Sequence, residues 1–81
     1  MVVKFNTVQF NFLAKQLRVE RPDLFKYFEN NDGLMFVLND DIANEVRDWA
    51  GEKLQKEGFD INYKLTDTGK ILEQLEDLLY E

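Results

Sequence analysis

The sequence predicts a small single-domain α+β protein in which helices cover a two- to three-stranded sheet. Its 81 residues are enough for one domain, spanning 1–81, and 44% hydrophobic residues with one Pro and four Gly favour a packed core. The apolar pattern between residues 34 and 65 is strand-like, then helical, then strand-like. The predicted order is α-α-β-α-β-α, and an extra N-terminal edge strand over Val2, Val3 and Phe5 is left open.

The first 20 residues allow two interpretations. Apolar residues at positions 8, 10 and 12 alternate as in a strand, whereas those at positions 10, 13, 14 and 17 have helical spacing. We favour a helix over residues 8–18 capped by Thr7, since a threonine side chain accepts hydrogen bonds at a helix start. We expect Phe5 and Phe12 to lie in the core, because exposed apolar patches are rare on small proteins.

A second helix is predicted over residues 22–29. Pro22 suits its first position because the missing N–H is not needed there, and Asp23 follows in the first turn. The polar residues 30–33, which end in a glycine, predict a turn. The two helices would form a hairpin that covers one face of the sheet.

The central stretch predicts a strand at 34–38, a helix at 41–57 and a strand at 59–65. The first strand is a continuous apolar run, which is typical of a strand covered on both faces, whereas the second alternates apolar and polar residues. Asn39 and the aspartates after it suit a helix start, and Gly58 suits a left-handed residue at the helix end. A strand–helix–strand unit of this length favours a right-handed parallel crossover.

On the central helix, Trp49 falls on the apolar face, so we interpret it as a core residue. Gly51 weakens a helix interior by about 1 kcal/mol relative to Ala, which indicates that a neighbouring element packs closely against it. The last helix is predicted over residues 68–80, where Thr66 and Thr68 are candidate caps and leucines form an apolar stripe.

Charge and composition exclude several classes of function. The net charge is −6: residues 1–33 carry five basic and four acidic residues, and residues 34–81 carry five basic and twelve acidic ones. An acidic surface repels phosphate backbones and anionic lipids, so nucleic-acid and membrane binding are disfavoured. The chain has no Cys and no apolar stretch long enough to span a bilayer, and we expect it to be cytoplasmic.

The residue types also argue against catalysis. Ser, His and Cys do not occur, which removes the usual nucleophiles, the commonest acid–base residue and Cys/His zinc sites. A carboxylate site built from Asp40, Asp41 and Asp60 was considered, but adjacent acids at a helix start normally act as caps and Asp60 alternates with the apolar residues of its strand. We therefore expect no enzyme activity, no metal site and no cofactor.

Two groups of acidic residues are the candidate partner-binding sites. Glu45, Asp48 and Glu52 follow one another at helical spacing opposite the apolar face of the central helix. The second group lies on the last helix, near the end where negative charge opposes the helix dipole, and comprises Glu73, Glu76 and Asp77. A solvated face is the ordinary explanation; our hypothesis is a non-enzymatic accessory or inhibitory protein that docks a basic protein through the helices at 41–57 and 68–80.

An alternative comes from a local resemblance. Residues 54–59 and 63–70, followed by a leucine-rich helix, resemble the end of many winged-helix regulators, in which a strand ending in Leu-Thr leads through a Gly into a dimerisation helix. The resemblance covers about 27 residues and implies a transcriptional regulator that dimerises through its last helix. Residues 59–62 are too few for a wing, and the preceding helix is acidic where a DNA-reading helix is basic.

Overall fold

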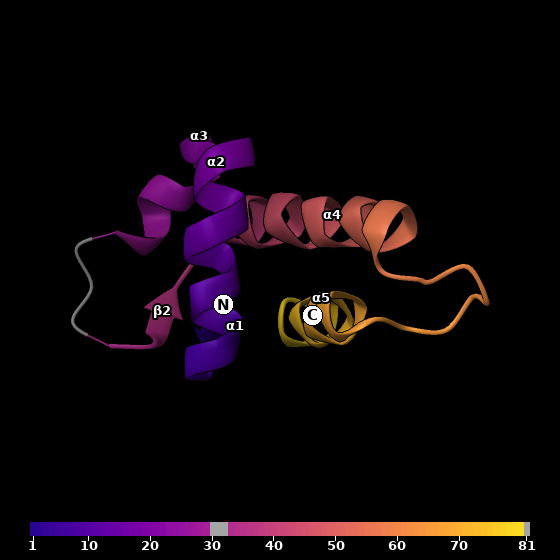
Figure 1. Cartoon of the computed structure of the whole chain (residues 1–81). Coiled ribbons are helices and arrows are strands. Elements are labelled where there is room, and N and C mark those ends of the chain that lie inside the picture. The colour runs from indigo at the N-terminus through magenta and orange to yellow at the C-terminus, as the bar shows by residue number, and fades with distance from the viewer. Residues whose placement is uncertain (30–32, 81) are drawn as a thin grey trace.

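The fold is a small α+β domain, as predicted. The computed structural model describes residues 1–29 and 33–80. Figure 1 shows an upright N-terminal helical rod beside a short β-ribbon, crossed by a long helix that pairs with the last one. In chain order the elements are β1 (Val2–Lys4), α1 (Thr7–Phe12), η1 (Leu13–Leu17), α2 (Arg18–Glu20), α3 (Pro22–Phe25), η2 (Lys26–Phe28), β2 (Met35–Val37), α4 (Asp40–Glu57) and α5 (Asp67–Leu78).

The N-terminal rod is helical from residue 7 to residue 20, which decides between the two interpretations of its first turn. Helix α1 begins with a capping box: Asn6 Oδ1 accepts from the backbone N–H of Gln9 at 2.8 Å, and Gln9 Oε1 accepts from that of Asn6 at 2.9 Å. The predicted cap, Thr7, is therefore one residue too late. The middle of the rod, η1, is a π-helix whose Leu13 and Leu17 are both fully buried.

The second predicted helix is confirmed as two short pieces. Helix α3 begins at Pro22, and the 3-10 helix η2 follows it without a break. The turn predicted over residues 30–33 falls mostly on residues 30–32, which lie outside the described part of the chain.

The sheet is a two-stranded antiparallel ribbon in which Val3 pairs with Phe36. The edge strand left open by the sequence is therefore present as β1, and the strand predicted at 34–38 is β2. Phe36 lies inward, 5.1 Å from the ring of Phe28 and 5.6 Å from that of Phe10, so the helical elements cover this face as expected. The opposite face is open, since Val37 is 82% exposed, and the prediction of a strand covered on both sides is wrong.

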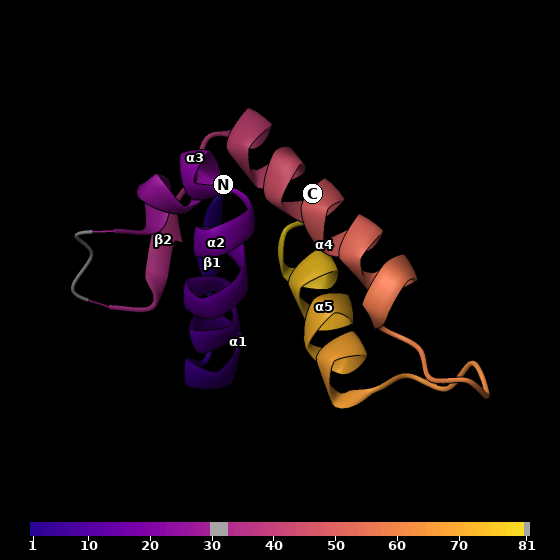
Figure 2. The same cartoon turned by 45° about the horizontal axis from the view of Figure 1, so that its top comes forward.

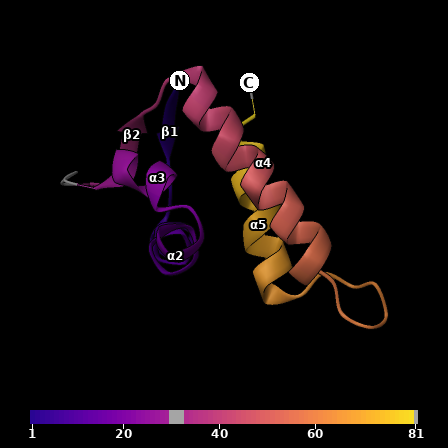
Figure 3. The same ribbon diagram turned by 90° about the horizontal axis from the view of Figure 1, so that it is seen from above.

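The strand predicted at 59–65 is wrong, and with it the parallel crossover. Only an isolated antiparallel bridge joins Phe59 to Leu65, while Ile61 and Tyr63 are 93% and 87% exposed. Asp60 Oδ1 accepts from two backbone N–H groups, those of residues 62 and 64, which bends the segment into a tight turn. Figures 2 and 3 show this loop at the far end of the α4–α5 pair, away from the β-ribbon. The observed order is therefore β-α-α-β-α-α.

Helices α4 and α5 form an antiparallel hairpin in which the two lie side by side (Figures 2 and 3). Both predicted starts are confirmed: Asn39 accepts from the N–H of Ile42 at 2.8 Å, and Thr66 accepts from that of Gly69 at 3.0 Å. The prediction that Gly58 adopts a left-handed conformation is wrong, since its φ is −83°. A Cβ there would lie 2.5 Å from the Leu54 carbonyl oxygen.

The two helices of the hairpin pack against each other through the leucine stripe of α5. Leu72, Leu75 and Leu79 are fully buried, as are Val46 and Ala50 on the facing side of α4. Within the described residues, no helix is both long enough and apolar enough to cross a membrane. Because the apolar sides of α4 and α5 face each other, the polar sides of the hairpin, including the candidate acidic residues, lie on the outside.

Candidate functional site

The six candidate acidic residues lie on the outer sides of the α4–α5 hairpin. On α4, Glu45, Asp48 and Glu52 are all exposed and form one row, which we call the acidic ridge. On α5, Glu73 and Asp77 are exposed and Glu76 is half-buried. None of the six forms a salt bridge within 4.0 Å in residues 1–29 and 33–80.

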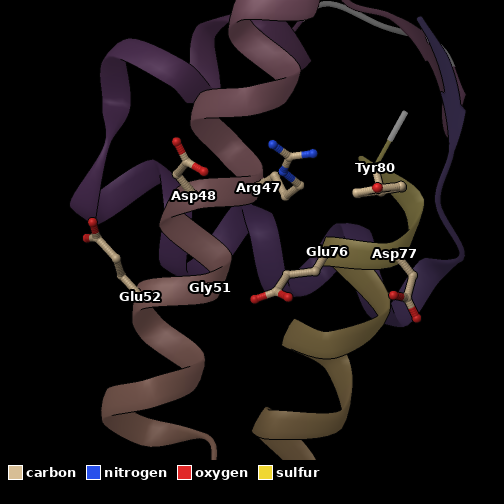
Figure 4. Close-up of a pocket in the computed structure, with 7 residues that line it drawn as sticks. All are labelled: Arg47, Asp48, Gly51, Glu52, Glu76, Asp77 and Tyr80. Atoms are coloured by element: carbon tan, nitrogen blue, oxygen red, sulfur yellow. The ribbon is translucent and has the colours of Figure 1, made fainter.

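Four of the six line one groove between the two helices. The groove has a volume of about 470 Å³, and we call it the α4–α5 groove. Figure 4 shows the Glu76 side chain extending from α5 toward Gly51. Asp48 and Glu52 lie on the far side of α4, and Asp77 points outward from α5. Its lining residues are Arg47, Asp48, Gly51, Glu52, Glu76, Asp77 and Tyr80. Glu45 and Glu73 are not among them.

Gly51 forms part of the groove wall, which explains the glycine within α4. A Cβ built on Gly51 would lie 2.8 Å from Glu76 Oε1, so the carboxylate rests against the bare backbone of α4. The prediction that an element packs closely here is confirmed, and the element is a side chain of α5. One turn away, the Arg47 guanidinium lies over the Tyr80 ring, with Cζ 5.5 Å from the ring centroid.

A second hollow borders the acidic ridge on the side of the N-terminal rod. It measures about 290 Å³ and is lined by Arg21, Glu45, Asp48, Trp49 and Glu52. Asp23 accepts from the Arg21 guanidinium at 2.8 Å; this hydrogen bond raises the pKa of Arg21, and Glu45 and Glu52 add to the rise. One arginine therefore borders the ridge on each side, Arg21 here and Arg47 in the α4–α5 groove.

Helical spacing placed Lys53 on the buried face of α4, but the sequence did not indicate its partners. Lys53 is only 7% exposed, and its ammonium donates to Glu20 and Glu57, each at 2.5 Å. Trp49 Nε1 also donates to Glu20, at 3.2 Å. Together these four residues, which we call the Lys53 cluster, fasten α2 to α4. No pattern in the sequence links residue 20 with residue 53, which is why the cluster was missed.

The Lys53 cluster shifts the pKa values of its members. The hydrogen bond from Lys53 lowers the pKa of the Glu20 carboxyl, against the opposing effect of burial. Burial alone would lower the pKa of the Lys53 ammonium, but its bonds to Glu20 and Glu57 outweigh that effect and raise it. Both groups are thus held in their charged forms.

The sequence predicts that three aromatic residues, Phe5, Phe12 and Trp49, belong to the core, and the structure places two of them there. Trp49 is 7% exposed and lies 6.2 Å from the half-buried Phe12 ring, while Phe5 is 1% exposed. The interpretation of Phe5 and Trp49 as core residues is confirmed, whereas Phe12 packs against the core and remains half-buried at the surface.

The carboxylate site considered from the sequence does not assemble. Asp40 and Asp41 lie at the first turn of α4, whereas Asp60 follows its last turn, and an 18-residue helix spans roughly 27 Å. No group of three or more acidic residues suited to hold a metal ion occurs in the described ranges.

Comparison of the chain with protein-family models, with curated proteins and with solved structures gives no match. The winged-helix resemblance also meets a geometric difficulty. The leucines that a dimerisation helix would present to a second copy, Leu72, Leu75 and Leu79, are fully buried against the chain's own helices.

Proposed function

We propose that this protein is a non-enzymatic interaction module, of the accessory or inhibitory kind, that docks a basic segment of another protein on the α4–α5 hairpin. The observation that carries the proposal is that Asp48, Glu52, Glu76 and Asp77 all line one groove, where Arg47 is the single cation among the described residues that line it. Four negative charges and one positive charge leave this groove with a formal charge of −3. A basic partner would be attracted and oriented by that field.

The placement of the acidic residues on α5 supports the proposal. Asp77 is the penultimate residue of α5, where negative charge opposes the helix dipole, and it lies four residues after Glu73. Each of these unfavourable interactions costs a few tenths of a kcal/mol in an isolated helix. A bound cation would relieve both, so a feature that weakens the free protein strengthens the complex.

The proposal is tested by affinity capture with charge-matched variants. The test variant replaces three acidic groove residues with their amides: Asp48→Asn, Glu52→Gln and Asp77→Asn. The control variant makes the same charge change elsewhere, with Glu29→Gln, Asp60→Asn and Asp67→Asn, three exposed positions that do not line the groove. Both variants carry a formal charge of −3 instead of −6.

Capture from the source cell's lysate is performed with and without nuclease. We expect wild type and the control variant to retain a partner protein after nuclease treatment. We expect the test variant to lose it. Equal retention by both variants would reject the hairpin as the docking surface. Capture that disappears with nuclease would instead favour the regulator interpretation, and the DNA affinity should then fall steeply with salt.

A further inference from the structure

We propose that the α4–α5 groove takes an arginine side chain of the basic partner, and that Tyr80 keeps the groove open by holding Arg47 away from Glu76. This inference rests on the proposed function and deepens it by naming the group that is recognised. It concerns one place on the hairpin, where two residues of α4 face Glu76 of α5 and Tyr80, which follows the end of α5.

Four residues, Arg47, Gly51, Glu76 and Tyr80, lie at the corners of this place, which we call the arginine cell. Arg47 and Gly51 are one turn apart on α4, whereas Glu76 lies in the last turn of α5 and Tyr80 follows the end of that helix at Leu78. Arg47 faces Tyr80 at 5.5 Å, and Gly51 faces Glu76, whose Oε1 would lie 2.8 Å from a Cβ at Gly51 (Figure 4). The absence of a side chain at Gly51 leaves the space that the Glu76 carboxylate occupies.

The Glu76 carboxylate is the group in this cell that calls for a cation. It is half-buried, and no hydrogen bond or salt bridge to it is formed by the described residues. Arg47, the cation among the described residues that line the groove, lies over the Tyr80 ring instead. A carboxylate that is partly withdrawn from water and has no counterion gains from a cation supplied by a partner.

The shape of the cell favours arginine over lysine. A guanidinium is planar and can donate two parallel N–H bonds to one carboxylate, and it sheds water more readily than an ammonium. The neighbouring Arg47 already shows that a guanidinium fits against this groove's aromatic side chain. The further carboxylates at the rim, Asp77 and Glu52, add attraction without requiring a fixed geometry.

Tyr80 is a positioning residue in this scheme. Without its ring, Arg47 would be free to turn to Glu76 and neutralise it within the chain, which would close the cell to an incoming arginine. The cation–π contact with Tyr80 offers Arg47 another position, and it is worth about 0.5–1 kcal/mol at an exposed site.

The test measures binding of two fluorescently labelled peptides by anisotropy at low salt. Both are 12-residue alanine-based helices of identical design, one with three arginines and the other with three lysines at the same positions. We expect wild type to bind the arginine peptide roughly fivefold more tightly, as the additional bidentate bond implies. Equal binding of the two peptides would overturn the inference.

Variants of the cell separate the role of Tyr80 from a general effect on the surface. Tyr80→Leu should abolish the preference for arginine, and adding Arg47→Gln to it should restore the preference. The control is Tyr27→Leu, because Tyr27 carries a comparable contact with Lys26 at 5.2 Å on a different part of the protein. We expect this control to bind both peptides as wild type does.

The outcomes distinguish this inference from the proposed function. If neither peptide binds more weakly to the triple amide variant than to its charge-matched control, the proposed function fails. If binding depends on those acids while the double variant Tyr80→Leu/Arg47→Gln does not regain the preference, the docking surface stands and the arginine cell is rejected. Tyr80 is 71% exposed, so its replacement should leave the fold intact, as thermal unfolding of the variant would verify.

Discussion

Replacing Gly51 with Ala is the sharpest test of how the hairpin is built. A glycine inside a helix costs about 1 kcal/mol relative to alanine, and Gly51 lies near the middle of α4. The new Cβ would stand 2.8 Å from Glu76 Oε1, which is too close, but the obstacle is the far end of a flexible side chain. Turning that side chain aside costs about 0.5 kcal/mol, the low end for a displaced rotamer, which is less than the gain in helix propensity. We therefore expect Gly51→Ala to stabilise the fold by about 0.5 kcal/mol.

The assay is urea and thermal unfolding of four proteins: wild type, Gly51→Ala, Glu76→Ala and the double variant. For a domain of this size, a gain of about 0.5 kcal/mol raises Tm by roughly 2–4 °C. In the Glu76→Ala background the obstacle is gone, so Gly51→Ala should give its full gain of about 1 kcal/mol. A loss of stability on adding Gly51→Ala in both backgrounds would refute the reasoning, because it would show that something other than Glu76 meets residue 51.

The same substitution has an opposite effect on binding. A methyl group at Gly51 takes the space that the Glu76 carboxylate occupies and turns that carboxylate away. We expect Gly51→Ala to lose the preference for the arginine peptide while it unfolds at a higher temperature than wild type. The groove would then account for the glycine at position 51, because alanine there would raise the stability of the fold but weaken recognition of arginine.

The remaining predictions concern the fold. Lys53→Met should cost about 1 kcal/mol at neutral pH after allowance for the solvent exposure of its partners, and it should flatten the pH dependence of unfolding. In wild type, the pKa of Glu20 is lowered, so its contribution to stability is present above the ordinary pKa of 4.5 and is lost as the pH falls through its pKa in the folded protein. The pKa of Lys53 is raised, so its contribution to stability is present below the ordinary pKa of 10.5 and is lost as the pH rises through its pKa in the folded protein. Urea unfolding across this range checks both limbs, and an unchanged acid limb in Lys53→Met would contradict the assignment. Leu72→Ala should cost about 2–5 kcal/mol of stability, because the leucine is fully buried. Ile61→Ala should change stability by less than about 0.5 kcal/mol, because the isoleucine is 93% exposed. Similar losses from both variants would mean that the 59–65 segment packs as a strand. Gly69→Ala should destabilise by more than about 1 kcal/mol, because its Cβ would meet the Gly58 carbonyl group, a backbone that cannot turn aside, and unfolding at the wild-type temperature would contradict that close contact.

The parts of the fold that the sequence predicted are those determined by local chemistry. The start of α4 at Asn39, the start of α3 at Pro22 and the cap at Thr66 each follow from a side chain that supplies or spares a hydrogen bond. The buried sides of α4 and α5 follow in the same way from helical spacing. These features need no knowledge of what packs against them.

The segment 59–65 shows why local pattern was not sufficient elsewhere. Its alternation of apolar and polar residues satisfies the requirement for a strand with one buried face, yet a strand also needs a neighbour that offers N–H and C=O groups. The partner of β2 is β1, from the start of the chain, and in residues 1–29 and 33–80 no strand lies beside the segment. Asp60 instead accepts the turn's own N–H groups, and Ile61 and Tyr63 are left in solvent. Which strands pair is a property of the whole chain, and alternation alone does not contain it.

The candidate site divides along the same line. The sequence identified the acidic ridge on α4 and the acidic end of α5 separately, because each is a matter of spacing on one helix. Their meeting at one groove depends on how closely the helices approach, and that approach rests on Gly58 and Gly69, whose backbones touch where the hairpin turns. With a side chain at Gly69, whose Cβ would meet the Gly58 carbonyl group, the helices would stand further apart, and Glu76 would no longer reach the backbone of Gly51. Gly51 and Gly69 therefore set the distance across which the acidic residues of α4 and α5 act together, and the groove is a consequence of the side chains that these two positions lack.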